Sequence, residues 1–209
     1  MLVRDASLSD LDAVVEVHLR AFEGFFLTNL GSSFLRELYR GFICDKRGII
    51  IVAEDGDQGI VGFAAGTDFP ETFFRNLRNR RAPYFIVYSV PAMLRHPIMV
   101  AKKLCSAISY RGDEPDAIDG GVLLSSIGVL PNVRGRSCGR LLLEQFEGRA
   151  ISRSAQFVYL MTDGLNNEKV RCFYEGAGYV VESERVRGDQ RLMIRYVKKL
   201  RRIGTCDGN

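Results

Sequence analysis

Three observations predict a single α/β domain (α+β in some classifications). The 209 residues suit one domain, and an apolar fraction of 46% with a charged fraction of 26% is ordinary for a globular protein. Residues 49–53 are a continuous apolar run, which is typical of a buried strand. Residues 121–197 show the pattern of strand, helix, strand, helix and a final hairpin. We expect this domain over residues 1–198, followed by a basic, flexible tail over residues 199–209.

The elements expected before residue 67 form a strand, two helices and an antiparallel hairpin. Ser9 or Asp10 can cap the first helix, and the loop 54–59 is made of residues that tolerate turns. The expected strands are 2–4, 49–53 and 60–66, and the expected helices are 11–22 and 34–42. Later in the chain we expect strands at 121–130, 157–161, 179–186 and 191–197, with helices at 141–150 and 167–176.

Residues 70–115 are expected to be a helical insertion between two strands of the sheet. Pro91 and Pro97 cannot donate backbone hydrogen bonds, so the pattern predicts two or three short helices. The segment has more apolar positions than short surface helices need for docking. These positions are Phe73, Phe74, Leu77, Tyr84, Phe85, Val87, Tyr88, Met93 and Leu94.

Composition narrows the cellular setting and the class of partner. The net charge of +4 is mild and does not by itself indicate a nucleic-acid partner. Five cysteines without a CxxC pair, and only two histidines, predict no metal site and free thiols in a reducing cytoplasm. Acidic residues near the N-terminus argue against a signal peptide, and the longest uncharged stretch, residues 82–94, is too short to span a bilayer. We therefore expect a cytoplasmic protein without a transmembrane segment.

The most informative segment is VLPNVRGRSCGRLL, residues 129–142. A buried strand ends at Pro131, and a short turn leads directly into a helix. The first amides of a helix lack internal partners and lie at the positive end of its dipole, so this turn suits an anion such as a pyrophosphate. The pattern is neither GxxxxGK[ST] nor GxGxxG, which disfavours a nucleoside triphosphatase and a dinucleotide-binding fold.

This segment resembles motif A of the GCN5-related N-acetyltransferase (GNAT) superfamily, [QR]-x-x-G-x-[GA]. Arg134 matches its first position and Gly139 its last, whereas Ser137 stands where the family normally has its first glycine. That departure either weakens cofactor binding or replaces one small residue by another. Residues 167–179, NEKVRCFYEGAGY, resemble the family's motif B, with an asparagine followed seven residues later by Tyr-Glu.

The resemblance implies a central mixed, mostly antiparallel sheet of six to seven strands, with a V-shaped splay between strands four and five. It implies that Tyr174 donates a proton to the departing thiolate and that Asn167 contacts the cofactor. The backbone of Ile127, Gly128 and Val129 would pair with the pantetheine arm. The amides of Arg134, Gly135, Arg136, Ser137, Cys138 and Gly139 would hold the pyrophosphate.

The function implied is an acetyl-CoA-dependent N-acetyltransferase that transfers acetyl directly to an amine in a ternary complex. The acceptor stays open among a small amine, an amino sugar and a peptide amine, and the base stays open among Asp68, His96, Asp119 and Ser126. His18 is expected to be a core or boundary histidine. Alternatives are an acyl-CoA-binding sensor or interaction module without turnover, and a nucleic-acid-binding protein suggested only by arginine clusters.

For the 70–115 insertion the first expectation is a lid over the acceptor channel, docked against the sheet edge. Self-association into a homodimer comes second, and contact with a membrane surface through the arginines comes third. An extra layer of core is the remaining alternative.

Overall fold

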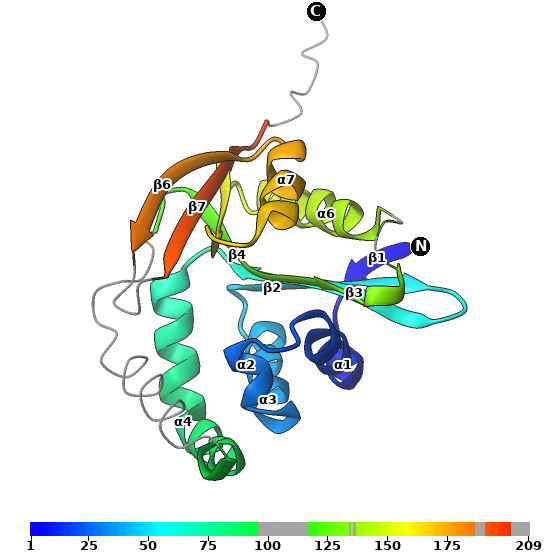
Figure 1. Cartoon of the computed structure of the whole chain (residues 1–209), viewed down its shortest axis with the longest axis vertical. Coiled ribbons are helices and arrows are strands. Elements are labelled where there is room, and N and C mark those ends of the chain that lie inside the picture. Colours follow the sequence, from blue (N-terminus) through cyan, green and yellow to red (C-terminus); the bar gives the residue numbers. More distant parts are fainter. Residues whose placement is uncertain (96–116, 134, 136, 187–190, 202–209) are drawn as a thin grey trace, which may run out of the picture.

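The computed structural model describes residues 1–95, 117–133, 135, 137–186 and 191–201 (Figure 1). Within them, seven strands form one sheet in the order β1-β2-β3-β4-β5-β7-β6. Neighbouring strands are antiparallel except β4 and β5, which are parallel. The expected mixed, mostly antiparallel sheet is therefore confirmed. The strands are β1 (Leu2–Asp5), β2 (Gly48–Asp55), β3 (Gly59–Thr67), β4 (Gly121–Val129), β5 (Phe157–Asp163), β6 (Val180–Val186) and β7 (Leu192–Lys199).

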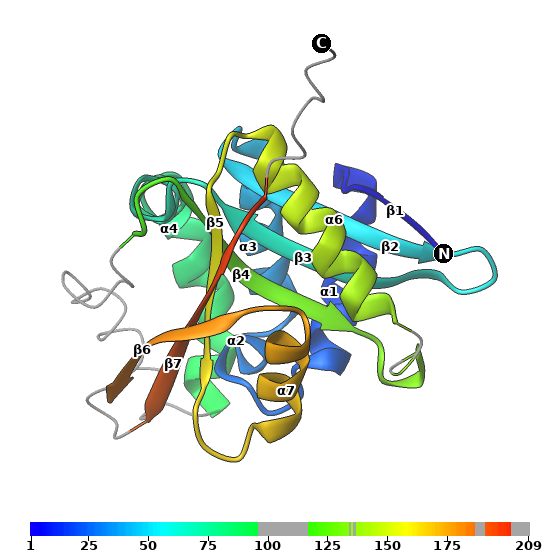
Figure 2. The ribbon, with the colours of Figure 1, turned by 90° about the horizontal axis from the view of Figure 1, so that it is seen from above.

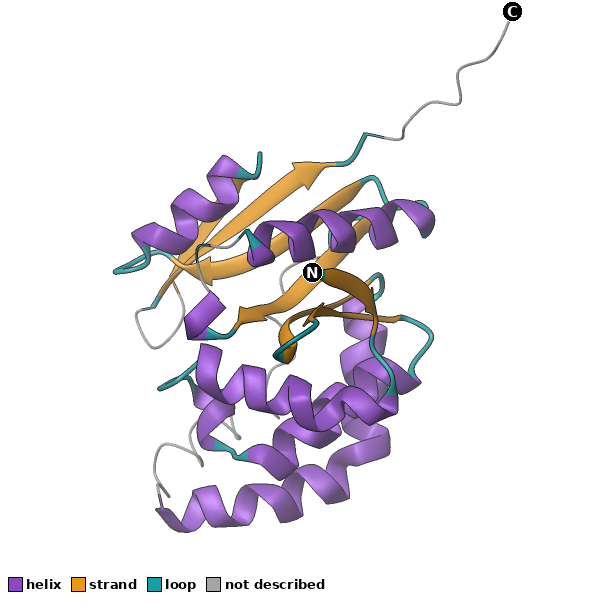
Figure 3. Ribbon diagram, turned by 90° about the vertical axis from the view of Figure 1, so that its right-hand side faces the viewer, coloured by secondary structure: helices purple, strands orange, loops and turns teal. Residues whose placement is uncertain are grey.

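Helices cover both faces of the sheet (Figures 1 and 3). One face carries α1 (Leu11–Ala21), α2 (Phe26–Asn29) and α3 (Ser32–Cys44), and the other carries α6 (Cys138–Ser152) and α7 (Glu168–Gly176). Buried aromatic and aliphatic side chains fill the space between each helical layer and the sheet. Examples with no exposed surface are Tyr39 and Leu35 on α3, Phe63 on β3, and Leu142 and Phe146 on α6.

The first part of the expected insertion is one continuous helix, α4 (Pro70–Arg95), between β3 and β4. The prediction of two or three short helices is wrong over this part, because the helix continues through Pro91 without a break. Pro83 also lies inside it. The Ser89 hydroxyl donates a 2.6 Å hydrogen bond to the Phe85 carbonyl, one turn back along the chain. Residues 96–115, which include Pro97, lie outside the described residues. No helix in the described part of the chain is long and apolar enough to cross a bilayer.

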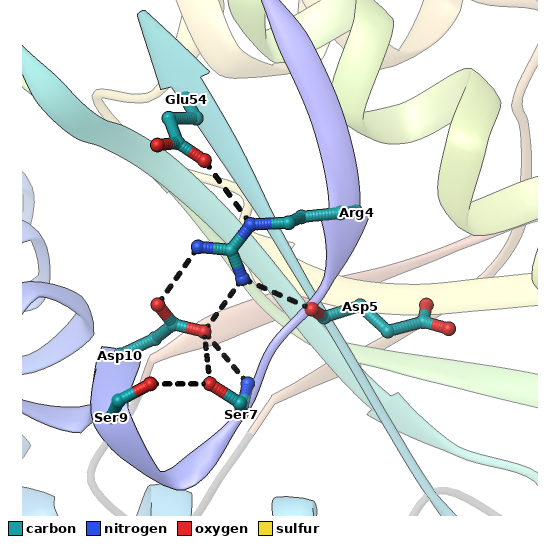
Figure 4. Close-up of polar contacts among 6 residues, drawn as sticks. All are labelled: Arg4, Asp5, Ser7, Ser9, Asp10 and Glu54. Atoms are coloured by element: carbon teal, nitrogen blue, oxygen red, sulfur yellow. Dashed lines mark hydrogen bonds and ion pairs between the residues drawn. The ribbon is translucent and has the colours of Figure 1, made fainter.

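A charged cluster ties the first strand to the turn before α1 (Figure 4). The Arg4 guanidinium donates two hydrogen bonds to Asp10, at 2.7 and 2.9 Å, and one to Glu54 on β2, at 3.1 Å. The Ser7 amide and hydroxyl also donate to the Asp10 carboxylate. Arg4 and these donors hold the pKa of Asp10 well below its usual value despite burial. Asp10 therefore stands at the N-cap position of α1, as expected from the sequence, but its carboxylate makes no capping bond to that helix and instead accepts from Arg4 and Ser7.

Candidate functional site

The parallel strands β4 and β5 separate after a short paired stretch. They pair only from Gly121↔Phe157 to Leu123↔Tyr159, although β4 continues to Val129 and β5 to Asp163. Beyond this point β5 pairs with β7 and β4 pairs with β3, so the facing edges of β4 and β5 diverge (Figure 2). The expected V-shaped splay is present, and the β4 edge facing β5 has backbone groups without a strand partner.

A β-bulge lies where the splay begins. Ala65 pairs with Ser126 and Gly66 with Leu124, so Ser125 is an extra residue in β4. A bulge bends its strand and increases the local twist, which turns the end of β4 away from β5. Gly128 allows this bent strand to pack closely on α1, because a Cβ there would lie 3.0 Å from Phe22 and 3.3 Å from Ala21.

The N-terminus of α6 follows directly from the open end of β4. The Leu141 amide donates a hydrogen bond to the Ser137 carbonyl, so the hydrogen-bond ladder of α6 begins at Ser137. Ser137 makes no side-chain capping bond, so the first amides of α6 have no cap from that residue. Fifteen residues of helix place the positive end of the dipole at this turn. The arrangement suits an anion that approaches the backbone closely.

The turn itself has left-handed backbone at two residues. Gly135 has φ of 83° and Ser137 has φ of 59°, so the serine occupies a conformation that favours glycine. Only the backbone of Cys138 is available to a ligand, because its side chain is 2% exposed and burial raises the pKa of its thiol to about 11. Arg134 and Arg136 lie outside the described residues, so their expected contacts are not placed.

Helix α7 brings the second motif to the same end of the sheet. Asn167 precedes α7, and its side-chain amide donates to the Thr162 hydroxyl at 2.7 Å and to the Asp163 carbonyl at 3.2 Å. Asn167 therefore holds the end of β5 beside the splay. Tyr174 is 7% exposed and packs with its ring centroid 6.0 Å from that of Tyr196.

The position of Tyr174 relative to the splay follows from strand register. Tyr196 on β7 pairs with Leu160 on β5, one residue beyond the last β4–β5 pair. Tyr174 therefore packs next to the point where the V opens. Burial raises the pKa of its phenol, so the hydroxyl stays protonated at neutral pH. A protonated phenol in this position is a candidate proton donor.

Phe173 joins the two motifs, although neither sequence motif assigns it a role. A Cβ added to Gly139 would lie 3.5 Å from the Phe173 ring and 3.8 Å from the Val129 side chain. The ends of β4, α6 and α7 thus meet at Gly139. Phe173 could have been noticed only as the apolar neighbour of Tyr174, because its partners lie 34 and 44 positions earlier in the chain.

Comparison with solved structures identifies the fold. No protein-family model and no curated protein matches the chain. A structure from Desulfovibrio desulfuricans, described as an acetyltransferase of the GNAT family, superposes with a TM-score of 0.62 at 16% identity over 96% of this chain and 99% of that one. The chain has the GNAT fold. Escherichia coli ribosomal-protein-S18-alanine N-acetyltransferase shares this GNAT fold at a TM-score of 0.58 and 14% identity, with 100% of this chain and 99% of that one covered. Aminoglycoside 6'-acetyltransferase type Ii also shares the fold, with a TM-score of 0.62 and 17% identity. The match covers 98% of this chain and 100% of that one.

Ser126 is the one described candidate base that lies on the open part of the GNAT strand β4. Asp68 pairs with Arg153 at 3.3 Å and follows Thr67, which pairs with Leu123 at the closed end of the V. Asp119 is exposed and precedes β4, and His96 lies outside the described residues. Ser126 is half-buried and hydrogen-bonds the Tyr39 hydroxyl.

His18 continues this chain of polar groups into the core of the GNAT fold. Its Nδ1 atom lies 2.6 Å from the Tyr39 hydroxyl, and the side chain is 3% exposed, which confirms a core histidine. Its Nε2 atom is buried and has no hydrogen-bond partner among the described residues. Burial lowers the pKa of His18 to about 4, so the folded protein holds a neutral imidazole.

We expect stability to fall as the pH drops below 6.5. The folded His18 stays neutral down to about pH 4, whereas the unfolded histidine, with its ordinary pKa of 6.5, already binds a proton. This difference is expected to remove about 2 kcal/mol of unfolding free energy between pH 7 and pH 5. Urea unfolding of the wild type and of His18→Gln at both pH values measures it. His18→Gln should lose this part of the pH dependence, and an identical slope in both proteins would contradict the assignment.

Proposed function

We propose that the protein is an acetyltransferase that uses acetyl-CoA as the donor and an amine as the acceptor. The observation that carries the proposal is the juxtaposition, in a GNAT fold, of an open β4 edge and an α6 N-terminus that the Ser137 side chain does not cap. The unpaired backbone of Ile127 and Val129 is suited to hydrogen-bond the amides of the pantetheine arm. The first amides of α6, with Gly135 in the turn, are suited to bind the pyrophosphate.

For direct transfer the protein must position the amine against the thioester and must assist the movement of two protons. The acceptor amine must lose a proton, and the thiolate of coenzyme A must gain one as it leaves. Tyr174 is the proposed donor to the thiolate, since its raised pKa keeps the proton on the phenol. Ser126 is proposed to contact the acceptor amine and to receive its proton. It lies on the part of β4 that has separated from β5, and its hydroxyl is hydrogen-bonded to Tyr39.

The acceptor is proposed to approach from the face of the sheet that carries α1 and α2. The opposite face is occupied by α6, whose first amides are the proposed pyrophosphate site, and by α7 (Figure 2). Ser126 and Tyr39 are linked across the α3 side of β4, so the proposed proton path from the amine also lies on this face. The exposed Phe25 in the loop between α1 and α2 is available to contact an acceptor there.

Release of free thiol from acetyl-CoA, measured with a panel of amines, tests the proposal. Proteins with this fold include enzymes named for ribosomal-protein alanine, spermidine and aminoglycoside acetylation, so the panel should contain an alanine-terminated peptide, a polyamine and an aminoglycoside. We expect calorimetric binding of acetyl-CoA and amine-dependent thiol release with at least one class. Binding without release across the panel would favour the sensor without turnover, and no binding of acetyl-CoA would reject the proposal.

A further inference from the structure

Helix α4 has apolar side chains on two opposite sides. One side packs on the protein: Phe73 and Leu77 are buried against α3, and Ala92 is buried beside Leu30. The opposite side faces solvent. Its apolar residues recur at the spacing of one helical face and are 40–80% exposed: Ile86, Val87, Val90, Met93 and Leu94.

Residues 82–94 of α4 carry no charged side chain, and a helical segment that is apolar on opposite sides is normally covered on both. Five neighbouring exposed apolar side chains are more than the scattered single residues usual on a soluble surface. A contiguous apolar patch of this kind marks a surface that meets a partner or a membrane. We call these five residues the outer face of α4.

Unpaired positive charge lies at one end of the outer face. After Glu71, helix α4 contains no acidic residue and has arginines at 75, 78, 80, 81 and 95. Arg75, Arg78 and Arg80 are exposed, and none of them forms an ion pair with a side chain in the described ranges. Arg80 precedes Val87 by seven residues, which places both on the same stripe of the helix. The stripe therefore changes from cationic to apolar along α4.

A hollow beside this stripe adds a second cationic feature. It has a volume of about 440 Å³ and lies between α3 and α4. Three arginines, two carboxylates and two tyrosines are among the residues that line it: Arg40, Arg80, Arg81, Glu37, Asp45, Tyr84 and Tyr88. Glu37 at its wall is buried and pairs with Arg81 and, at 3.6 Å, with Arg40. Arg80 keeps its charge available to the hollow. Arginine and tyrosine together suit a phosphate group held at the level of lipid headgroups.

We propose that the outer face of α4 docks on an anionic membrane surface. The apolar side chains would enter the boundary between headgroups and acyl chains, and the free arginines would neutralise lipid phosphates. A second copy of the chain fits less well. In a two-fold interface through this face α4 would meet α4, whose only carboxylate, that of Glu71, would face five arginines from each helix.

Tryptophan fluorescence can test insertion directly, because the chain contains no tryptophan. Leu94→Trp places a reporter on the outer face, and Val180→Trp places a matched one at an exposed position of β6. With vesicles of phosphatidylcholine containing phosphatidylglycerol, we expect the emission of Leu94→Trp to shift to the blue and that of Val180→Trp to stay unchanged. Emission of Leu94→Trp that is already blue-shifted without vesicles would mean that the protein itself covers this face, and would overturn the proposal.

Co-sedimentation with the same vesicles separates the apolar and the charged contributions. Val87→Glu with Leu94→Glu is expected to weaken binding about tenfold or more. The control Val180→Glu with Val186→Glu adds the same charge at equally exposed positions on β6 and should leave binding unchanged. Arg75→Gln and Arg80→Gln are expected to weaken binding roughly fivefold each and to reduce its salt dependence.

Three results would overturn the proposal. One is wild-type protein that stays in the supernatant with anionic vesicles. The second is an equal loss of binding in the outer-face variant and in the β6 control, with circular dichroism confirming that both are folded. The third is a wild-type dimer in light scattering that the outer-face variant converts to monomer, since this would assign the face to a second copy.

Discussion

Gly139→Asp is expected to weaken binding of acetyl-CoA severely while leaving the protein as stable as before or slightly more so. A carboxylate in the first turn of α6 interacts favourably with the helix dipole, which adds about 0.3–1 kcal/mol to stability. The same carboxylate would lie where we propose that the pyrophosphate binds, and the repulsion is expected to weaken binding about 100-fold or more. Calorimetry with coenzyme A and a thermal melt measure the two effects, which have opposite signs.

Gly139→Asn is the matched control, because it has the same size without the charge. The Cβ of either side chain would make ordinary contacts with Phe173 and Val129, so steric effects on the free protein are similar. We expect Gly139→Asn to bind acetyl-CoA more tightly than Gly139→Asp, because most of the affinity lost in Gly139→Asp comes from charge repulsion. A folded Gly139→Asp variant with wild-type affinity would rule out the α6 N-terminus as the pyrophosphate site.

The elements that could be predicted from the sequence are those fixed by local burial patterns. The apolar run at 49–53 lies inside β2, and the predicted strand 60–66 lies inside β3. The turn before α6 was visible because a proline, glycines and a helical apolar pattern follow one another in a short stretch. Such signals are local, and tertiary contacts reinforce rather than override them.

The features that could not be predicted depend on contacts between distant parts of the chain. The sequence around Ser125 gives no sign of a bulge, because a bulge is defined only by the pairing of β4 with β3. Tyr39 reaches Ser126 across 87 positions. The four-residue helix α2 is too short to show periodicity. Pro91 predicts a break in α4, yet the helix runs through it, and packing on α3 supports its continuity.

The left-handed backbone at Ser137 gives a physical meaning to the departure from the GNAT motif. A serine in this conformation costs about 1 kcal/mol relative to glycine, which adopts it freely. The loop therefore keeps the geometry that a glycine would support, at the expense of some strain. On this view, the serine replaces one small residue by another without closing the proposed anion site.

Tyr174→Phe is expected to lower kcat about 100-fold with little change in the KM for acetyl-CoA, which is the usual scale for loss of a general acid. The variant removes only a hydroxyl, and that hydroxyl makes no hydrogen bond to any residue in the described ranges. The ring should therefore keep its packing against Tyr179 and Tyr196, with nearly unchanged stability. Initial rates of thiol release at saturating acceptor give kcat and KM.

Tyr179→Phe provides the control, because it removes a hydroxyl from an equally buried neighbour. The Tyr179 hydroxyl donates a 3.1 Å hydrogen bond to Glu147, so its loss should reduce stability by roughly 1–3 kcal/mol. Since this bond lies toward α6 and away from the splay, kcat should stay near the wild-type value. The two variants thus exchange roles: Tyr174→Phe loses rate and keeps stability, whereas Tyr179→Phe loses stability and keeps rate. Wild-type kcat in Tyr174→Phe, with chemistry shown to be rate-limiting by the absence of a pre-steady-state burst, would mean that Tyr174 only packs α7 against β7.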